Sequence, residues 1–224
     1  MSKGTSSLPD VLDVQDITQN QPFCAGVIVI HDGCLLATLN TDGLPADLTD
    51  SAWRIGGFGG CQERGETMSE CAVREAREEL CVDVRLVHAS VTYFHDVDSG
   101  AMQAVRCSDA VAPFLLQRKR HPSLHMPYRP GLPTGPYIYF GLFFAEPAAA
   151  AMQPGDDVAG LLLLPVTQWR LLEHQPAVDT VLCHGAKVIE KEPLDRRRRL
   201  WLHPEESFTV VAALLGANPE LIGQ

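Results

Sequence analysis

Three glutamates and one arginine are spaced so that a single helix would present them on a common face. At about 100° per residue, a helix over residues 68–80 places Arg74, Glu75, Glu78 and Glu79 on one continuous arc. Like charges three and four residues apart destabilise a helix by about 0.2–0.5 kcal/mol per pair, and one arginine cannot neutralise three carboxylates. A divalent cation would remove that repulsion, because clustered hard oxygen donors are what Mg²⁺ or Mn²⁺ prefers. These residues are therefore candidate ligands of a divalent metal.

The segment before this helix adds further carboxylates and a glycine cluster. Glu63 and Glu66 lie on the loop that enters the helix, and Gly59 and Gly60 would let backbone groups approach a ligand closely. A solvated acidic helix face is the usual meaning of clustered surface charge, and the charges taken alone favour that interpretation. The spacing of the whole segment is what decides against it.

That spacing resembles the Nudix box, G-x5-E-x7-R-E-U-x-E-E-x-G-U, in which U is a bulky aliphatic residue. The matching positions are Gly60, Glu66, Arg74, Glu75, Glu78, Glu79 and Val82. Ala76 replaces the bulky aliphatic residue, and Cys81 replaces the glycine that ends the helix. Neither departure removes a carboxylate, but Cys81 puts a side chain where a left-handed C-cap favours glycine.

Resemblance to the Nudix hydrolases implies an α+β fold in which a mixed β-sheet is sandwiched between α-helices. It implies that Glu78 and Glu79 are the principal ligands of Mg²⁺ or Mn²⁺. Glu75 would be a further ligand or the catalytic base, and the Gly60 carbonyl would face the metal. Arg74 would hold the glutamates in place by charge-assisted hydrogen bonds, so the expected catalytic set is Arg74, Glu75 and Glu79.

Four residues are expected near the substrate, and some have simpler explanations. They are Gly59, Glu66, Arg118 and Asp157. Glu66 is better suited to supporting its loop, and Arg118 lies in a basic run for which a solvated loop is the favoured interpretation. In this family the base can come from a later loop, where Asp156 and Asp157 are the candidates, although a simple turn is favoured there.

The activity that the resemblance implies is metal-dependent hydrolysis of a diphosphate linkage in a nucleoside diphosphate derivative. Metal ions would screen the diphosphate charge and activate water, and a carboxylate would accept the proton. ADP-ribose or another nucleotide sugar is the first expectation for the substrate. The alternative is a nucleotide-sensing binding module on the same fold without turnover, and the retained box carboxylates favour the enzyme.

The chain is expected to divide into three parts. Residues 1–22 form a polar N-terminal arm, and residues 23–180 form the hydrolase domain, which contains a proline-rich insertion over residues 106–136. Residues 181–224 form a C-terminal extension that is partly helical. Nothing in the residues decides the oligomeric state, but the family commonly dimerises and either terminal part could supply a homodimer interface.

Local patterns predict the elements that would carry the box. Thr67 to Glu70 has the spacing of a capping box and predicts a helix start. The apolar runs and turns predict a hairpin from Phe23–Ile30 and Cys34–Leu39, further strands over Val82–Val87, Ala89–Phe94, Tyr137–Ala145 and Leu161–Val166, and a tail helix over residues 205–215.

Composition limits the partners. A formal net charge of −10 disfavours general binding to nucleic acid or to anionic membranes, and the basic run over residues 196–199 is weak support for a nucleic-acid binder. No apolar run approaches the roughly 20 residues needed to cross a bilayer, and the polar start does not predict a signal peptide.

The seven cysteines include no Cys-x-x-Cys pair, which fits small buried residues in a reducing compartment. These features predict a cytoplasmic location.

Overall fold

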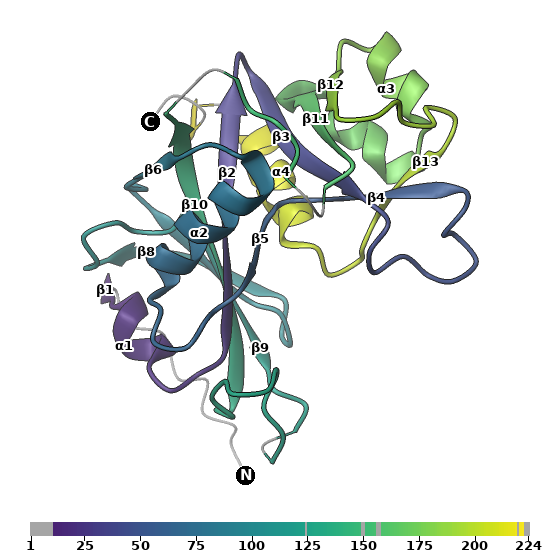
Figure 1. Cartoon of the computed structure of the whole chain (residues 1–224). Coiled ribbons are helices and arrows are strands. Elements are labelled where there is room, and N and C mark those ends of the chain that lie inside the picture. The colour runs from purple at the N-terminus through teal and green to yellow at the C-terminus, as the bar shows by residue number, and fades with distance from the viewer. Residues whose placement is uncertain (1–10, 124, 149–150, 156–157, 219, 222–224) are drawn as a thin grey trace.

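Two long parallel strands, β2 (Phe23–His31) and β10 (Tyr137–Pro147), run side by side through the centre of the fold (Figure 1). Each pairs with two different strands along its other edge. The first half of β2 pairs with β5 and its end pairs with β3, while β10 pairs first with β9 and then with β6. The two strands therefore join both wings of the sheet and place β5 beside the centre.

The computed structural model describes residues 11–123, 125–148, 151–155, 158–218 and 220–221. In chain order the elements are β1 (Val11–Leu12), α1 (Val14–Thr18), β2, β3 (Cys34–Asn40), β4 (Ala52–Gly56), β5 (Phe58–Cys61), α2 (Met68–Leu80), β6 (Val84–Val87), β7 (Thr92–Asp96), β8 (Ala101–Cys107), β9 (Leu115–Arg120), β10, β11 (Gly160–Pro165), the 3₁₀ helix η1 (Val166–His174), α3 (Val178–Cys183), β12 (Lys187–Glu190), β13 (Arg199–Leu202) and α4 (Ser207–Ala217). Within the described residues, no helix is long and apolar enough to span a membrane.

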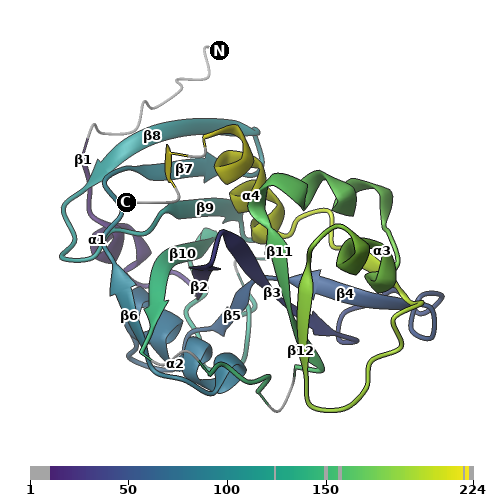
Figure 2. The ribbon, with the colours of Figure 1, turned by 90° about the horizontal axis from the view of Figure 1, so that it is seen from above.

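The sheet is mixed and has helices on both faces (Figure 2). The neighbours β2–β10, β7–β9, β4–β13 and β1–β8 are parallel, and the other pairs are antiparallel. One buried cluster lies under α2 and the other lies under α4. Successive side chains of a strand point to opposite faces of the sheet, so the apolar run of β11 contributes to both clusters. Leu161 and Leu163 belong to the α2 cluster, and Leu162 and Leu164 belong to the α4 cluster. The α+β class expected from the sequence, a mixed sheet between helices, is confirmed.

Helix α2 begins and ends where its sequence predicts. The Thr67 hydroxyl accepts the Glu70 amide, and the Glu70 carboxylate accepts the Thr67 amide at 2.8 Å, so the capping box is present. Cys71, Ala72, Ala76 and Leu80 are buried on the side of α2 that faces the sheet, while Val73 is half-buried. Cys81 adopts the left-handed conformation with φ of 52°, so the chain ends this helix without the usual glycine.

The structure adds detail to the three parts expected outside the box. In the expected N-terminal arm, Leu12 and Val14 are buried and β1 pairs with β8, so residues 11–20 pack on the sheet. The proline-rich insertion contains β9, a strand between β7 and β10 with Leu115 and Leu116 buried. The C-terminal extension is part of the same fold, since β12 pairs with β11, β13 pairs with β4, and α4 covers one face of the sheet.

The approach of β5 to β2 requires glycine. Gly26 lies opposite Gly59, and a Cβ on Gly26 would be 1.7 Å from the Phe58 carbonyl oxygen. That contact is with backbone and cannot be relieved by a side-chain rotation. The two glycines therefore set how closely the strand that leads into α2 packs on the central sheet.

We expect Gly26→Ala to lower the free energy of unfolding by about 3 kcal/mol or more, because β5 would have to move away from β2. Urea denaturation of the purified protein measures this. Gly33→Ala is the matched control, since its Cβ would meet nothing within 4 Å and its φ of 73° predicts a cost of only about 1–2 kcal/mol. Equal losses in the two variants would contradict the packing argument.

Candidate functional site

Helix α2 covers the outer edge of β5 through two of its box residues. Strand β5 pairs with β2 on one side, which leaves backbone groups on its other side without strand partners. The Gly59 amide donates to the Glu79 carboxylate at 2.7 Å, and Arg74 Nη2 donates to the Cys61 carbonyl at 2.9 Å. The expected metal ligand Glu79 and the expected organiser Arg74 therefore both bind the strand edge.

Arg74 is also the centre of a carboxylate cluster. Its Nε and Nη2 donate to the two oxygens of Glu66 at 2.7 and 3.1 Å, which is the bidentate arrangement of a strong ion pair. Its Nη1 donates to Glu75 at 2.7 Å and to Glu78 at 3.2 Å. Glu66 in turn accepts the Glu63 amide at 2.7 Å, so it supports the loop that enters α2. The organising role expected of Arg74 matches these contacts.

The pKa values of the two carboxylates bound most closely by Arg74 are shifted in opposite directions. Hydrogen bonds from Arg74 lower the pKa of Glu66, and the Glu63 amide contributes in the same sense. Burial raises the pKa of Glu75, although the Arg74 hydrogen bond and charge oppose the shift. The hydrogen bonds to Glu66 and Glu75 raise the pKa of Arg74, so the guanidinium stays charged.

Gly60 packs directly beneath Glu75. A Cβ at position 60 would lie 2.4–2.5 Å from the Glu75 carboxyl atoms. The box glycine therefore leaves room for the carboxylate that follows the box arginine. Cys71, on the buried side of α2, donates to the Gly60 carbonyl at an Sγ–O distance of 3.7 Å.

A divalent metal was expected at this corner, and the donor chemistry is consistent with one. Glu75, Glu78 and Glu79 supply carboxylate oxygens from one helix face, which is a ligand type that Mg²⁺ and Mn²⁺ take. The Gly60 carbonyl accepts the Cys71 thiol. Across the part of the chain that the structure describes, however, no group of three or more His, Cys, Asp or Glu side chains is arranged as a metal site. The carboxylates instead contact Arg74 and the Gly59 amide.

The end of α2 is closed by a segment from far along the chain. The Gly155 amide donates to the Glu79 carbonyl at 2.9 Å, and the Gln153 amide donates to the Leu80 carbonyl at 3.1 Å. A Cβ on Gly155 would be 1.8 Å from the Glu78 carbonyl oxygen, so the contact requires glycine. The candidate bases Asp156 and Asp157 lie outside the described residues.

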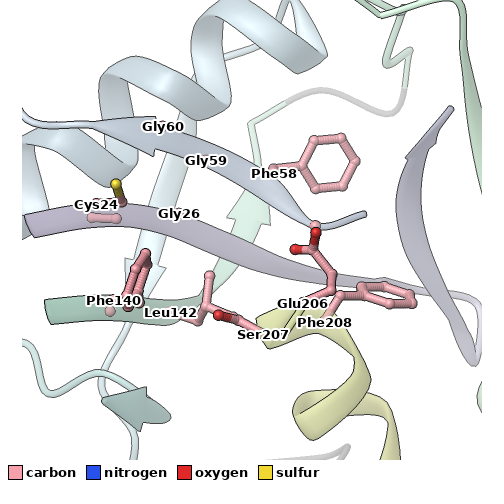
Figure 3. Close-up of a pocket in the computed structure, with 13 residues that line it drawn as sticks. Cys24, Gly26, Phe58, Gly59, Gly60, Phe140, Leu142, Glu206, Ser207 and Phe208 are labelled. Atoms are coloured by element: carbon pink, nitrogen blue, oxygen red, sulfur yellow. The ribbon is translucent and has the colours of Figure 1, made fainter. Parts of the chain in front are cut away.

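A pocket lies beside this corner, on the sheet face covered by α4 (Figure 3). Its volume is about 400 Å³, which includes space open to solvent. Gly57 and the β5 residues Phe58, Gly59 and Gly60 form one wall. In Figure 3, Cys24 and Phe140 lie at one end and Glu206 and Phe208 at the other.

Hydrogen bonds fix Glu206 and Ser207, which form the polar end of the pocket. The Arg54 guanidinium donates to Glu206 Oε2 at 2.9 Å. Ser207 donates to the amide oxygen of Gln117, a buried residue whose amide nitrogen is 2.8 Å from His95 Nδ1. The first turn of α4 is thereby fixed over the sheet with a carboxylate facing the pocket.

Arg118 is not part of the carboxylate corner. It lies on β9, separated from β5 by β10 and β2, where it pairs with Asp96 and stacks over Tyr137 with its guanidinium carbon 4.6 Å from the ring centre. The hydrogen bond from Arg118 lowers the pKa of Asp96 to about 2. In the structure Arg118 therefore forms an ion pair with Asp96 and lies away from the other residues expected near the substrate.

Sequence reasoning missed Arg129 and the residues of α4. Arg129, in the proline-rich stretch, lines an open depression with Arg74 and Glu75, and it is the exposed cation of this stretch that reaches the corner. Arg129 is a single cation among prolines, and no local pattern marks it as a ligand-binding residue. Glu206 stands beside Gly56 and Gly57 although it is 150 residues away in sequence, and no local pattern links them.

No protein-family model and no curated protein matches this sequence. Among solved structures, a NUDIX hydrolase from Nitrosomonas europaea is 14% identical with a TM-score of 0.35, and the match covers 62% of this chain and 55% of that one, little more than half its length. An ADP-ribose pyrophosphatase from Streptococcus suis is 10% identical with a TM-score of 0.39, over 88% and 92% of the two chains. A UDP-X diphosphatase is 10% identical with a TM-score of 0.40, over 97% and 68%. Similarities this low do not establish a family.

The ion pair of Arg74 and Glu66 predicts a pH-dependent effect on stability. Because the folded pKa of Glu66 is lowered, its contribution is present above the unfolded value of about 4.3 and is lost as pH falls toward the folded value. We expect Glu66→Gln to lower the free energy of unfolding by about 1.5–3 kcal/mol at pH 7 and by less at pH 3, measured by urea titrations across this range.

The double variant Arg74→Met with Glu66→Gln supplies the control. In the Arg74→Met background, replacing Glu66 should have a smaller and nearly pH-independent effect, because the partner that lowers the pKa is gone. A loss that stays constant from pH 7 to pH 3 in the wild-type background would contradict the ion-pair account.

Proposed function

We propose that this protein is a metal-dependent hydrolase of the Nudix type that cleaves a diphosphate linkage in a nucleoside diphosphate derivative. The observation that carries the proposal is the Arg74-centred corner, in which the box residues Glu66, Glu75 and Glu78 surround one guanidinium. These side chains occupy the positions that match the box in the sequence. The adjacent pocket gives a substrate somewhere to bind.

Glu75, Glu78 and Glu79 would hold Mg²⁺ or Mn²⁺, together with the Gly60 carbonyl. The metal would screen the diphosphate charge and lower the pKa of a bound water. Arg74 keeps Glu75 and Glu78 on the same side of the helix and neutralises part of their repulsion. Either Glu75 or one of Asp156 and Asp157, which lie outside the described residues, would accept the proton of the attacking water.

The cations at this corner fit a polyanionic substrate. Arg129 and Arg64 line the depression that also contains Arg74 and Glu75. Their guanidinium groups can donate to phosphate oxygens that a divalent metal does not contact. A strongly acidic chain would thereby keep a local site for a small anion.

The pocket beside β5 would take the ring system of the substrate. Phe140, Leu142 and Phe208 give it apolar surface, and the glycines of β5 leave a flat backbone wall. The Glu206 carboxylate can only accept hydrogen bonds when ionised, so it would select rings that present N–H donors, such as the exocyclic amine of adenine. ADP-ribose, the first expectation from the sequence, has such an amine on its adenine, which is joined to the diphosphate through a ribose.

A nucleotide-sensing module without turnover is the second candidate. In its favour, Glu75 and Glu78 contact Arg74 while Glu79 contacts the Gly59 amide, and these carboxylates are not arranged as a metal site in the described part of the chain. A sensor would bind the same ligands in the same pocket. Only turnover separates the two.

The decisive measurement is hydrolysis with Mg²⁺ of a panel comprising ADP-ribose, NADH, dinucleoside polyphosphates and nucleoside triphosphates, with products separated by chromatography. We expect metal-dependent turnover of at least one diphosphate derivative. Glu78→Gln and Glu79→Gln should each reduce kcat by roughly 100-fold or more, because each removes a charged oxygen donor while keeping the side-chain shape.

Glu70→Gln is the matched control on the same helix. Glutamine can still complete the capping box, so this variant should keep near wild-type turnover. Binding of several panel members without turnover of any would reject the hydrolase in favour of the sensor. Full activity in both Glu78→Gln and Glu79→Gln would remove the box from the mechanism.

Glu206→Gln tests the pocket. We expect KM for the preferred substrate to rise by roughly 10-fold to 100-fold with little change in kcat, because a charged acceptor contributes about 1.5–3 kcal/mol to binding a donor. Arg54→Gln breaks the Arg54–Glu206 ion pair but keeps the carboxylate, and should raise KM less. Equal effects of the two variants would mean that Glu206 acts only by positioning α4.

A further inference from the structure

Cys24 and Cys61 face each other across the pairing of β2 and β5. They are directly opposite in the antiparallel register, and their sulfur atoms are 2.8 Å apart. A disulfide bond is about 2.05 Å long, so the two atoms would have to approach by only about 0.8 Å to bond. Both cysteines are reduced in the structure.

The backbone at this point already has the spacing of a disulfide. The Gln62 amide donates to the Phe23 carbonyl at 3.1 Å, which makes that pair the hydrogen-bonded one. Hydrogen-bonded and non-hydrogen-bonded pairs alternate, so the next pair, Cys24 and Cys61, is non-hydrogen-bonded, with Cα atoms about 4.5 Å apart. Disulfides span Cα separations of about 4.4–6.8 Å, so a bond could close without breaking the ladder.

Small solutes can reach both thiols. Cys24 opens into the pocket of Figure 3 and Cys61 lines the depression that contains Arg129, and both side chains are half-buried. No other pair of cysteines in the described part of the chain shows a comparable sulfur contact. Cys71 is buried in the core, and Cys81 and Cys183 are exposed on separate elements.

We propose that Cys24 and Cys61 form a reversible redox modification site, at which a peroxide converts the two thiols into a cross-strand disulfide. One thiol sulfur attacks a peroxide oxygen, the O–O bond breaks, and water leaves as a sulfenic acid forms. The second sulfur then attacks the sulfenic sulfur, the S–O bond breaks, a second water leaves and the S–S bond forms. A dithiol reductant returns both thiols. This site does not rest on the proposed hydrolase activity.

The modification would fix the strand on which the carboxylate corner depends. Cys61 is the residue whose carbonyl accepts Arg74, and Gly59, two positions earlier, donates to Glu79. A bond from Cys61 to the central strand β2 removes the freedom of this end of β5 to separate from the sheet. The disulfide therefore links the oxidation state of the protein to the mobility of the candidate site.

The test is treatment of the reduced full-length protein with one equivalent of hydrogen peroxide, followed by alkylation of remaining thiols and peptide mass spectrometry. The expected result is a linked peptide pair containing Cys24 and Cys61, lost on treatment with dithiothreitol. The oxidised protein should unfold at a temperature higher by roughly 5–10 °C, and the amides of β5 should exchange hydrogen more slowly.

Cys24→Ser should abolish the linked peptide and the thermal shift, whereas Cys34→Ser, a half-buried cysteine on the neighbouring strand β3, should keep both. The proposal is overturned if peroxide leaves Cys24 and Cys61 alkylatable. It is also overturned if Cys61 passes to the sulfinic acid without a linked peptide. Because the linked peptide is measured on the wild-type chain, the test stays decisive even if a variant folds poorly.

Discussion

The free edge of β5 is the constraint on which the rest of the site depends. An edge strand must find partners for backbone groups that no neighbouring strand satisfies, or lose free energy through their desolvation. Here helix α2 supplies them, since Glu79 accepts the Gly59 amide and Arg74 donates to the Cys61 carbonyl. Arg74 and Glu79 are five residues apart on the helix, and they contact Cys61 and Gly59, which are two residues apart on the strand. The helix and the strand cannot shift relative to one another without breaking charge-assisted hydrogen bonds.

Arg74 also determines how much negative charge the corner can hold. It gives Glu66 two strong hydrogen bonds and Glu75 one, so the same guanidinium lowers the pKa of the first carboxyl while burial still raises that of the second. Glu78 is mostly exposed and is less constrained. The corner therefore combines a fixed support, Glu66, with a mostly exposed carboxylate, Glu78.

Elements outside the box supply the pocket and the cation that lie beside this corner. The first turn of α4 brings Glu206 and Phe208 to the face of β5, and the proline-rich stretch brings Arg129 beside Arg74. Neither segment is an appendage, because β9 and α4 belong to the sheet and its covering layer. Their placement explains how an acidic chain can present both an apolar pocket and local cations next to a carboxylate cluster.

Residues close together along the chain are enough to predict the start and end of α2 and the hairpin of β2 and β3, since capping, helical spacing and turns act over a few residues. The left-handed conformation of Cys81 does not follow from its residue type, because glycine is the residue expected there. The contacts of Arg118 with Asp96, of Cys24 with Cys61 and of Glu206 with β5 depend on the folded chain. Those contacts join segments up to 150 residues apart, and they follow from strand pairing and shared burial, which no local pattern encodes.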